Sequence, residues 1–165
     1  MTVQQILFIL FSALTLGTAL MAVTRRNVFH AALFLTLSFF GVAGLFVLLE
    51  APFLAGVQLF IYVGGIAILI VFAIMLTREM MNPAAPGANR QWASALLVAV
   101  ALCGVLAWVA LNHDWQVTPG PVSPDSMSNL GQALVDPQGF VLPFEVTAVF
   151  LLVAFIGAVT IARER

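Results

Sequence analysis

The chain has 165 residues, of which 62% are hydrophobic and only 8% are charged. This composition excludes a water-surrounded globule of this size, because so few polar groups cannot cover its surface, and it indicates a protein that lies in a lipid bilayer. Six basic and seven acidic residues nearly cancel, so the chain lacks the basic surface that nucleic-acid binding requires.

Five apolar stretches along the chain are long enough to cross a membrane, since a hydrocarbon core of roughly 30 Å needs about 20 residues at the helical rise. In chain order they are residues 3–23, 28–49, 53–76, 92–111 and 144–162. The predicted fold class is therefore an all-α integral membrane protein with five transmembrane helices in one membrane domain, residues 1–165.

The four connections between these stretches differ in length and character. Residues 25–27 form a short basic turn, and residues 51–52 form a shorter one in which Pro52 stops one helix and starts the next. The first three helices are therefore expected to be antiparallel neighbours. Residues 78–91 are polar and contain Asn82-Pro83 and Pro86-Gly87, which predicts a surface loop. Residues 112–142 form a long acidic loop rich in proline, glycine and serine.

The arginines predict how the chain is oriented, because basic residues near helix ends are retained on the cytoplasmic side. All six fall on one side of a five-helix serpentine: Arg25, Arg26, Arg78, Arg90, Arg163 and Arg165. The N-terminus is therefore expected outside and the C-terminus in the cytoplasm, with residues 112–142 as an outer loop.

The third apolar stretch has an unusual group of residues near its middle. Gln58 and Tyr62 are four apart, which places them on one helical face, and Gly64 and Gly65 follow at about mid-depth. Such glycines usually permit close helix packing, and a buried tyrosine usually bonds to a neighbouring helix. The same features also favour kinks or π-bulges and mark pathways through membranes. From these residues alone, both interpretations remain open.

Three glutamates near predicted helix ends are candidates for a proton path or a subunit interface. Glu50 ends the second helix, where the helix dipole disfavours an anion, so it is either a solvated boundary carboxylate or part of a proton relay. Glu145 is expected in the first turn of the fifth helix, where the dipole favours it. Glu79, beside Arg78, is expected at the cytoplasmic boundary.

Small residues recur every three positions in the second helix, at Ser38, Gly41 and Gly44. This spacing predicts tight packing against another helix. The sequence contains no metal-ligand cluster, phosphate-binding glycine loop or hydrolase triad. No catalytic, cofactor-binding or metal-binding residue is therefore expected on this chain.

Several segments together resemble the J subunits of bacterial respiratory complex I, the NADH:quinone oxidoreductase. They are NVFHAAL at 27–33, FLAGVQ at 53–58, YVGGIAILIVFAIML at 62–76 and LPFEV at 142–146, followed by Gly157-Ala158. The resemblance covers nearly the whole chain and is most specific in the third helix.

This resemblance implies a multi-pass subunit in the cell inner (plasma) membrane, within a proton-translocating complex that transports electrons from NADH to quinone. FMN, iron–sulfur clusters and quinone are expected on partner subunits. The expected partners are the H, A and K subunits, the antiporter-like N-type subunits and lipid.

In the family, a π-bulge in the third helix can convert to regular α-helix and is associated with a water path from the quinone cavity. Carried over, the switch residues are Tyr62, Val63, Gly64 and Gly65. Some relatives have glutamate where this chain has Gln58, so the expectation is gating of a path rather than proton carriage by this helix. The first alternative is a purely structural scaffold subunit of the same complex or of a related quinone-reducing complex with a different electron donor. The second is an independent small transporter, which is disfavoured because the sequence shows no inverted repeat.

Overall fold

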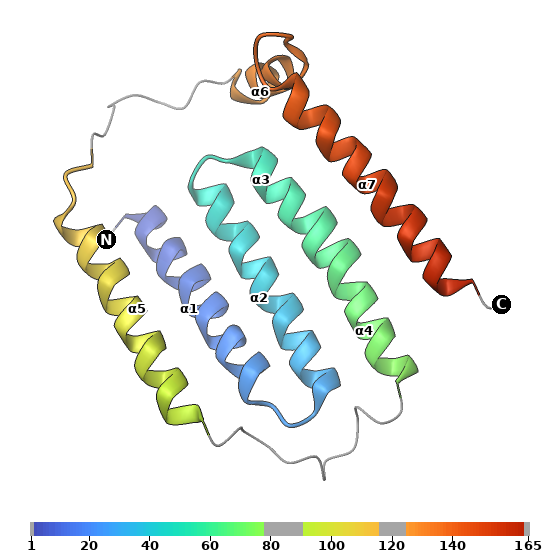
Figure 1. The fold of residues 1–165 in the computed structure, drawn as a ribbon. Coiled ribbons are helices and arrows are strands. Elements are labelled where there is room, and N and C mark those ends of the chain that lie inside the picture. Colours follow the sequence, from blue (N-terminus) through green and yellow to red (C-terminus); the bar gives the residue numbers. More distant parts are fainter. Residues whose placement is uncertain (1, 78–90, 116–124, 164–165) are drawn as a thin grey trace. The chain divides into compact units, whose positions relative to one another are not determined.

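The computed structural model describes residues 2–77, 91–115 and 125–163, and all the secondary structure in these ranges is helical (Figure 1). The helices are α1 (Val3–Thr24), α2 (Val28–Leu48), α3 (Pro52–Val57), η1 (Gln58–Ile66), α4 (Ala67–Leu76), α5 (Trp92–Asn112), α6 (Ser126–Val135) and α7 (Val141–Ala162). The segment η1 is a π-helix, and it joins α3 and α4 into one continuous helix.

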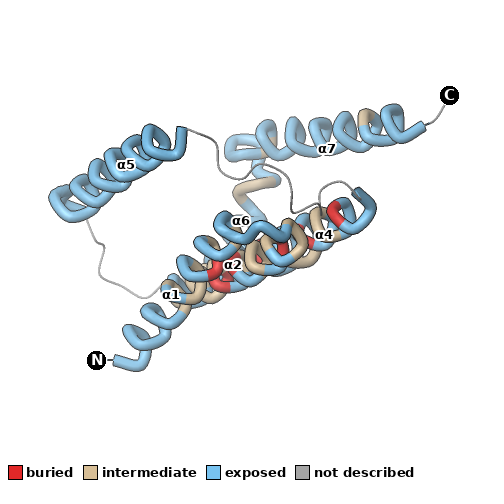
Figure 2. Tube along the Cα trace, turned by 90° about the horizontal axis from the view of Figure 1, so that it is seen from below, coloured by how far each residue is buried: buried red, intermediate tan, exposed pale blue. Residues whose placement is uncertain are grey.

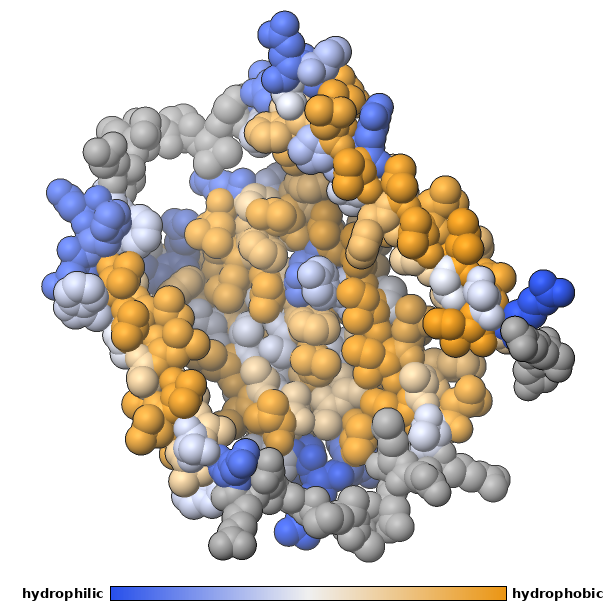
Figure 3. Space-filling view, in the orientation of Figure 1, coloured by the Kyte–Doolittle hydropathy of each residue, from blue (hydrophilic) through white to orange (hydrophobic). Residues whose placement is uncertain are grey.

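Five of these helical segments are long and apolar enough to span a membrane. They are α1, α2, the continuous helix Pro52–Leu76, α5 and α7, and the continuous helix is called the third span below. Figure 3 shows apolar side chains along α5 and α7. The five-helix fold class is therefore confirmed, with boundaries within three residues of those predicted. The orientation of the termini stays a prediction.

The first two spans begin with side-chain caps that the local sequence supplies. Thr2 and Gln5 form a capping box at the start of α1. Asn27 precedes α2, where its side-chain oxygen accepts hydrogen bonds from the backbone N–H groups of Phe29 at 3.0 Å and His30 at 3.2 Å. These bonds satisfy backbone N–H groups that have no partner within the helix, so Asn27 fixes the point at which α2 begins.

The small residues of α2 lie against α1, as their spacing predicted. The Ser38 hydroxyl donates to the Thr15 carbonyl of α1 at 3.1 Å. A Cβ added at Gly41 would collide with the Thr15 side chain, and one at Gly44 would collide with the Phe11 ring. The two backbones approach closely because these positions carry no larger side chain.

The second and third spans are joined by a turn closed by backbone hydrogen bonds. The Glu50 N–H donates to the Val47 carbonyl at 3.1 Å, and the Ala51 N–H donates to the Phe46 carbonyl at 3.0 Å. This pattern is a Schellman motif, whose central residue adopts the left-handed conformation that glycine prefers. Glu50 occupies that position with φ 55° and is exposed.

In this part of the chain α2 packs between α1 and the third span, which confirms the predicted order of neighbours. The buried positions marked red in Figure 2 lie on these three spans, and most of them are small residues. By contrast, no residue of α5 or α7 is buried by other described residues of this chain.

The chain divides into two compact units, residues 1–118 and 119–165, and the second unit contains a helix that the sequence did not predict. The predicted loop 112–142 includes α6, and α7 begins at Val141, three residues before the predicted start. Glu145 is therefore not in the first turn of the fifth span, and that prediction was wrong. Pro143 does not stop the helix, because the first helical turn needs no N–H from it.

Candidate functional site

The candidate site is the π-helix η1, which occupies nine residues in the middle of the third span. At its end the Ala67 N–H donates to the Tyr62 carbonyl, five residues earlier. A bond of this length along the chain defines a π-turn, which holds one residue more than an α-turn. The π-bulge predicted for the third helix is therefore confirmed. It begins at Gln58, earlier than the Tyr62–Gly65 region.

The buried side chains of the third span lie on the face that packs against α2. Ala55, Gln58, Ala67 and Ile74 are buried, and Val63 is partly covered. In the α-helical parts, Ala55 and Gln58 are three residues apart, and Ala67 and Ile74 are seven apart, or about two helical turns, as expected for one helical face. Between Gln58 and Val63 the step is five residues, which locates the extra residue inside η1.

An uninterrupted α-helix would not align these side chains. At about 100° per residue, the nine steps from position 58 to position 67 would leave Gln58 and Ala67 about 180° apart. With the extra residue taken up by the π-turn, the same two side chains lie about 80° apart. The π-helix therefore allows both halves of the third span to pack against α2.

Two of the predicted site residues contact the same residue of α2. The Gln58 Nε2 donates a hydrogen bond to the backbone carbonyl of Phe39 at 3.3 Å. The Tyr62 ring meets the Phe39 ring edge to face, with centroids 5.5 Å apart and planes at 71°. Gln58 is buried, whereas Tyr62 remains 41% exposed and has no hydrogen bond from its hydroxyl among the described residues. Phe39 thus contacts η1 through both its backbone and its ring.

The two glycines of η1 are not equivalent. A Cβ added at Gly64 would lie 3.3 Å from the Leu59 carbonyl oxygen, tighter than most such contacts, whereas one at Gly65 would lie an ordinary 3.8 Å from the Phe60 oxygen. In both cases the nearby carbonyl belongs to the residue five positions earlier. Position 64 therefore favours glycine in the π-helical register more strongly than position 65 does.

The structure brings together some of the predicted site residues and separates others. Five lie within η1: Gln58, Tyr62, Val63, Gly64 and Gly65. Glu50 lies in the turn before the third span, while Glu145 is an exposed residue of α7 in the other unit. Glu79, Arg78, Arg90, Arg165 and the predicted loop dipeptides lie outside the described residues. Among the described residues, no three His, Cys, Asp or Glu side chains form a group that could hold a metal ion.

Sequence reasoning missed Phe39, the residue of α2 that both Gln58 and Tyr62 contact. The chain contains 14 phenylalanines, and nothing in the local sequence distinguishes this one. Its position next to Ser38, in the predicted packing stripe of α2, placed it near a helix interface without indicating which helix it meets.

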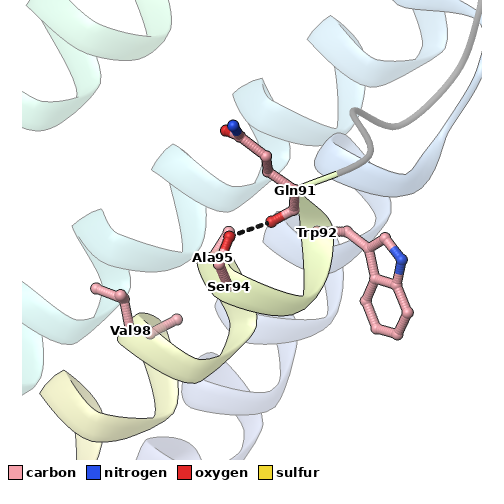
Figure 4. Close-up of a pocket in the computed structure, with 6 residues that line it drawn as sticks. Gln91, Trp92, Ser94, Ala95 and Val98 are labelled. Carbon is pink, nitrogen blue, oxygen red and sulfur yellow. Dashed lines mark hydrogen bonds between the residues drawn. The ribbon is translucent and has the colours of Figure 1, made fainter.

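A separate groove of about 580 Å³ lies at the start of α5 (Figure 4). It is lined by Gln91, Trp92, Ser94, Ala95, Val98 and Ala99. The Ser94 hydroxyl donates to the Gln91 backbone carbonyl at 2.8 Å, a bond that closes the first turn of the helix. None of these lining residues belongs to η1, so this groove is separate from the candidate site.

Comparison with known proteins gives matches that cover most of this chain. Residues 18–161 match the family described as NADH-ubiquinone/plastoquinone oxidoreductase chain 6. The chain belongs to this family. A chain 6 protein of NAD(P)H-quinone oxidoreductase from Leptolyngbya boryana is 36% identical over 164 residues, covering 98% of this chain and 81% of the relative.

Proteins named subunit J are also among the relatives of this chain. NADH-quinone oxidoreductase subunit J of Rhodobacter capsulatus is 31% identical, with 96% of this chain and 81% of the relative covered. F(420)H(2) dehydrogenase subunit J of Methanosarcina mazei is 34% identical, with 94% and 89% covered. The resemblance to J subunits is therefore confirmed, and the chain is a multi-pass membrane subunit of the quinone oxidoreductase family.

Proposed function

We propose that this chain is a membrane-arm subunit of a proton-translocating NADH:quinone oxidoreductase, in which a change of register in η1 helps couple quinone reduction to proton pumping. FMN, iron–sulfur clusters and the quinone belong to partner subunits in this proposal, and this chain contributes no catalytic centre. Its partners are the H, A, K and antiporter-like N-type subunits.

The observation that carries the proposal is the burial pattern of the third span. The residues that face α2 after η1 are Ala67 and Ile74. If η1 became α-helical while α3 stayed in place, α4 would turn by about 100°, and Ile66 and Ala73 would take their places. One sequence therefore offers two apolar faces to α2, as a two-state element requires.

The contacts of η1 support α4 as the part that turns. The closed turn at residues 49–51 ties the start of the third span to α2, and the Gln58–Phe39 hydrogen bond adds a second tie. The residues of α4 that face α2 are apolar, and among the described residues the Thr77 hydroxyl, just after α4, bonds to the Ala73 carbonyl of its own helix alone. Apolar contacts lack the directionality of hydrogen bonds, so this half rotates at lower cost.

The decisive experiment is to solve structures of the intact complex at rest, with reductant alone, and during turnover. We expect Ala67 to face α2 in one condition and Ile66 to face it in another. A purely structural scaffold subunit would keep one register throughout, and that result would reject the coupling proposal while leaving the family membership intact.

A second test uses Gly65→Val in the assembled complex. The β-branched side chain restricts the helix at the proposed switch, so we expect slower coupled quinone reduction with unchanged electron transfer from the donor to an artificial flavin-site acceptor. Gly56→Val is the matched control, because a Cβ at Gly56 meets nothing within 4 Å. Unchanged rates of both reactions in Gly65→Val would contradict the proposal.

The electron donor is a separate question, because the relatives carry names with different donors: NADH, NAD(P)H and F(420)H(2). NADH is proposed here, and a related donor is the alternative. Purifying the complex through this subunit, identifying its partners by mass spectrometry and assaying each donor with quinone distinguishes them. Reduction by another donor alone would reject the NADH assignment without affecting the proposed role of η1.

A further inference from the structure

The short helix α6 is amphipathic and uncharged. It contains ten residues, Ser126–Val135, and it is flanked by Asp125 and Asp136. At helical spacing, most of its apolar residues gather on one face and most of its polar residues lie on the opposite face, with Val135 at the polar edge and Ser126 within the apolar face. The apolar face is Met127, Leu130, Ala133 and Leu134, and the polar face is Ser128, Asn129 and Gln132. Ten residues rise only about 15 Å, too short a distance to cross a bilayer.

A tight corner fixes α6 to the start of the membrane span α7. The Gly139 N–H donates to the Asp136 carbonyl at 2.9 Å, and the Phe140 N–H donates to the Ala133 carbonyl at 2.9 Å. The Gln138 N–H donates to the Asp136 side chain at 3.0 Å. A Cβ at Gly139 would lie 2.7 Å from the Ala133 oxygen, so this close corner requires glycine.

The corner turns the apolar face of α6 toward α7. Ala133 and Leu134 are the only residues of α6 that are partly covered, and α6 packs on α7. In Figure 1, α6 is seen nearly along its axis while α7 runs in the plane of the picture, so the two helices are steeply angled. Because membrane spans are tilted by only about 20° on average, a helix steeply angled to α7 would lie closer to the plane of the membrane than to its normal.

The same apolar face extends beyond the contact with α7. Met127 is 60% exposed and Leu130 is 39% exposed. Exposed Phe140, Leu142 and Phe144 continue the apolar surface from the corner into α7, and Figure 3 shows apolar atoms along α7 up to this end of the unit. The uncovered part of α6 is therefore continuous with the surface of a membrane span.

We propose that α6 is an interfacial helix, with Met127 and Leu130 inserted into the boundary between lipid headgroups and acyl chains where α7 enters the bilayer. A short amphipathic helix in this position buries its apolar face in that boundary and keeps its polar face in water. Because α6 contains no lysine or arginine, its insertion depends on apolar contact and not on attraction to anionic lipid.

The test places the photoreactive residue p-benzoylphenylalanine at position 127, 130, 128 or 132 of the full chain. The intact complex is reconstituted in dioleoylphosphatidylcholine vesicles and irradiated, and the adducts on this subunit are identified by mass spectrometry. We expect several-fold more phospholipid adduct from positions 127 and 130 than from 128 and 132. Vesicles that also contain phosphatidylglycerol should give the same yield.

Adducts to another polypeptide at positions 127 and 130 would show that a partner subunit covers this face, and they would overturn the proposal. Equal lipid yields from all four positions would overturn it as well, because the apolar face would then have no preferred direction. Neither outcome bears on the register change proposed for η1, which lies in the other unit of the chain.

Discussion

Gln58 and Ala67 are nine positions apart in the third span, yet both side chains are buried on the face that meets α2. An α-helix would place them on opposite faces, at about 180°. The extra residue of η1 is what allows both contacts, so substitutions that favour one register over the other should change how the complex works.

Gly64→Ala should disfavour the π-helical register more than Gly65→Ala, because only the first adds a Cβ as close as 3.3 Å to a backbone oxygen, that of Leu59. Alanine also favours the α-helix by roughly 1 kcal/mol over glycine at either site. We expect Gly64→Ala to lower proton pumping per electron pair in vesicles more strongly. Equal effects of the two variants would mean that the Leu59 contact is unimportant.

Ala67→Leu should displace α4 from its present packing position against α2. Ala67 is 3% exposed, and overfilling such a packed site costs about 1–3 kcal/mol. We expect structures of the variant complex to show Ile66 facing α2 and quinone reduction uncoupled from pumping. Ile68→Leu is the control, since residue 68 is exposed and should behave as wild type. A variant that keeps position 67 against α2 with full pumping would contradict the two-face mechanism.

Phe39→Leu should weaken the contact of α2 with η1 by removing the ring that meets Tyr62. Aromatic pairs of this kind contribute about 0.5–1.5 kcal/mol, so we expect faster hydrogen exchange in η1 and reduced coupled activity. Tyr62→Phe keeps the ring contact and should have a smaller effect. Phe40→Leu, at a neighbouring exposed position, should leave both measurements unchanged, and a similar loss there would indicate general damage to α2.

Gly41→Ala should loosen the pairing of α1 with α2, because the added Cβ would collide with the Thr15 side chain and lie 3.2 Å from the Thr15 nitrogen. The expected cost to the packing of α1 on α2 is about 1–3 kcal/mol. We therefore expect quantitative mass spectrometry to find less of this subunit in the detergent-purified complex. A Cβ added at Gly17 meets nothing within 4 Å, so the Gly17→Ala variant should be retained like the wild type. Full retention of Gly41→Ala would show that the two helices can separate at little cost.

Glu50→Gly should raise the temperature at which this subunit dissociates from the complex, because a left-handed backbone costs a non-glycine residue about 1 kcal/mol. Glu50→Gln keeps the backbone cost and should not raise the dissociation temperature.

The same two variants test the role of the Glu50 carboxylate. Equal loss of pumping in both would assign the carboxylate to a proton path, and wild-type pumping in both would make it a solvated boundary residue.

The sequence predicted the five spans because membrane length and apolar composition set them locally. Gly64 and Gly65 alone left both a π-bulge and simple helix packing open, and the resemblance to J subunits predicted the π-bulge at residues 62–65, within the observed η1. The start of η1 at Gln58 was not predictable, because it depends on which side chains α2 buries. The contacts that distinguish Phe39 from the other phenylalanines are made between helices and cannot be read from the local sequence. The corner at Gly139, four residues beyond the end of α6, positions a helix that is too short and too polar to resemble a span.

The hydrogen-bonded turn before the third span fixes the start of that span to the end of α2. Because the Glu50 and Ala51 N–H groups are hydrogen-bonded to the end of α2, the proposed change in η1 would rotate only the part of the span that follows it, α4. A rotation of about 100° carries a side-chain tip roughly 5 Å from the helix axis through about 8 Å. In the proposed register change, this displacement would exceed the diameter of a water molecule, so a backbone change of one hydrogen-bond register would be sufficient to open or close a file of waters.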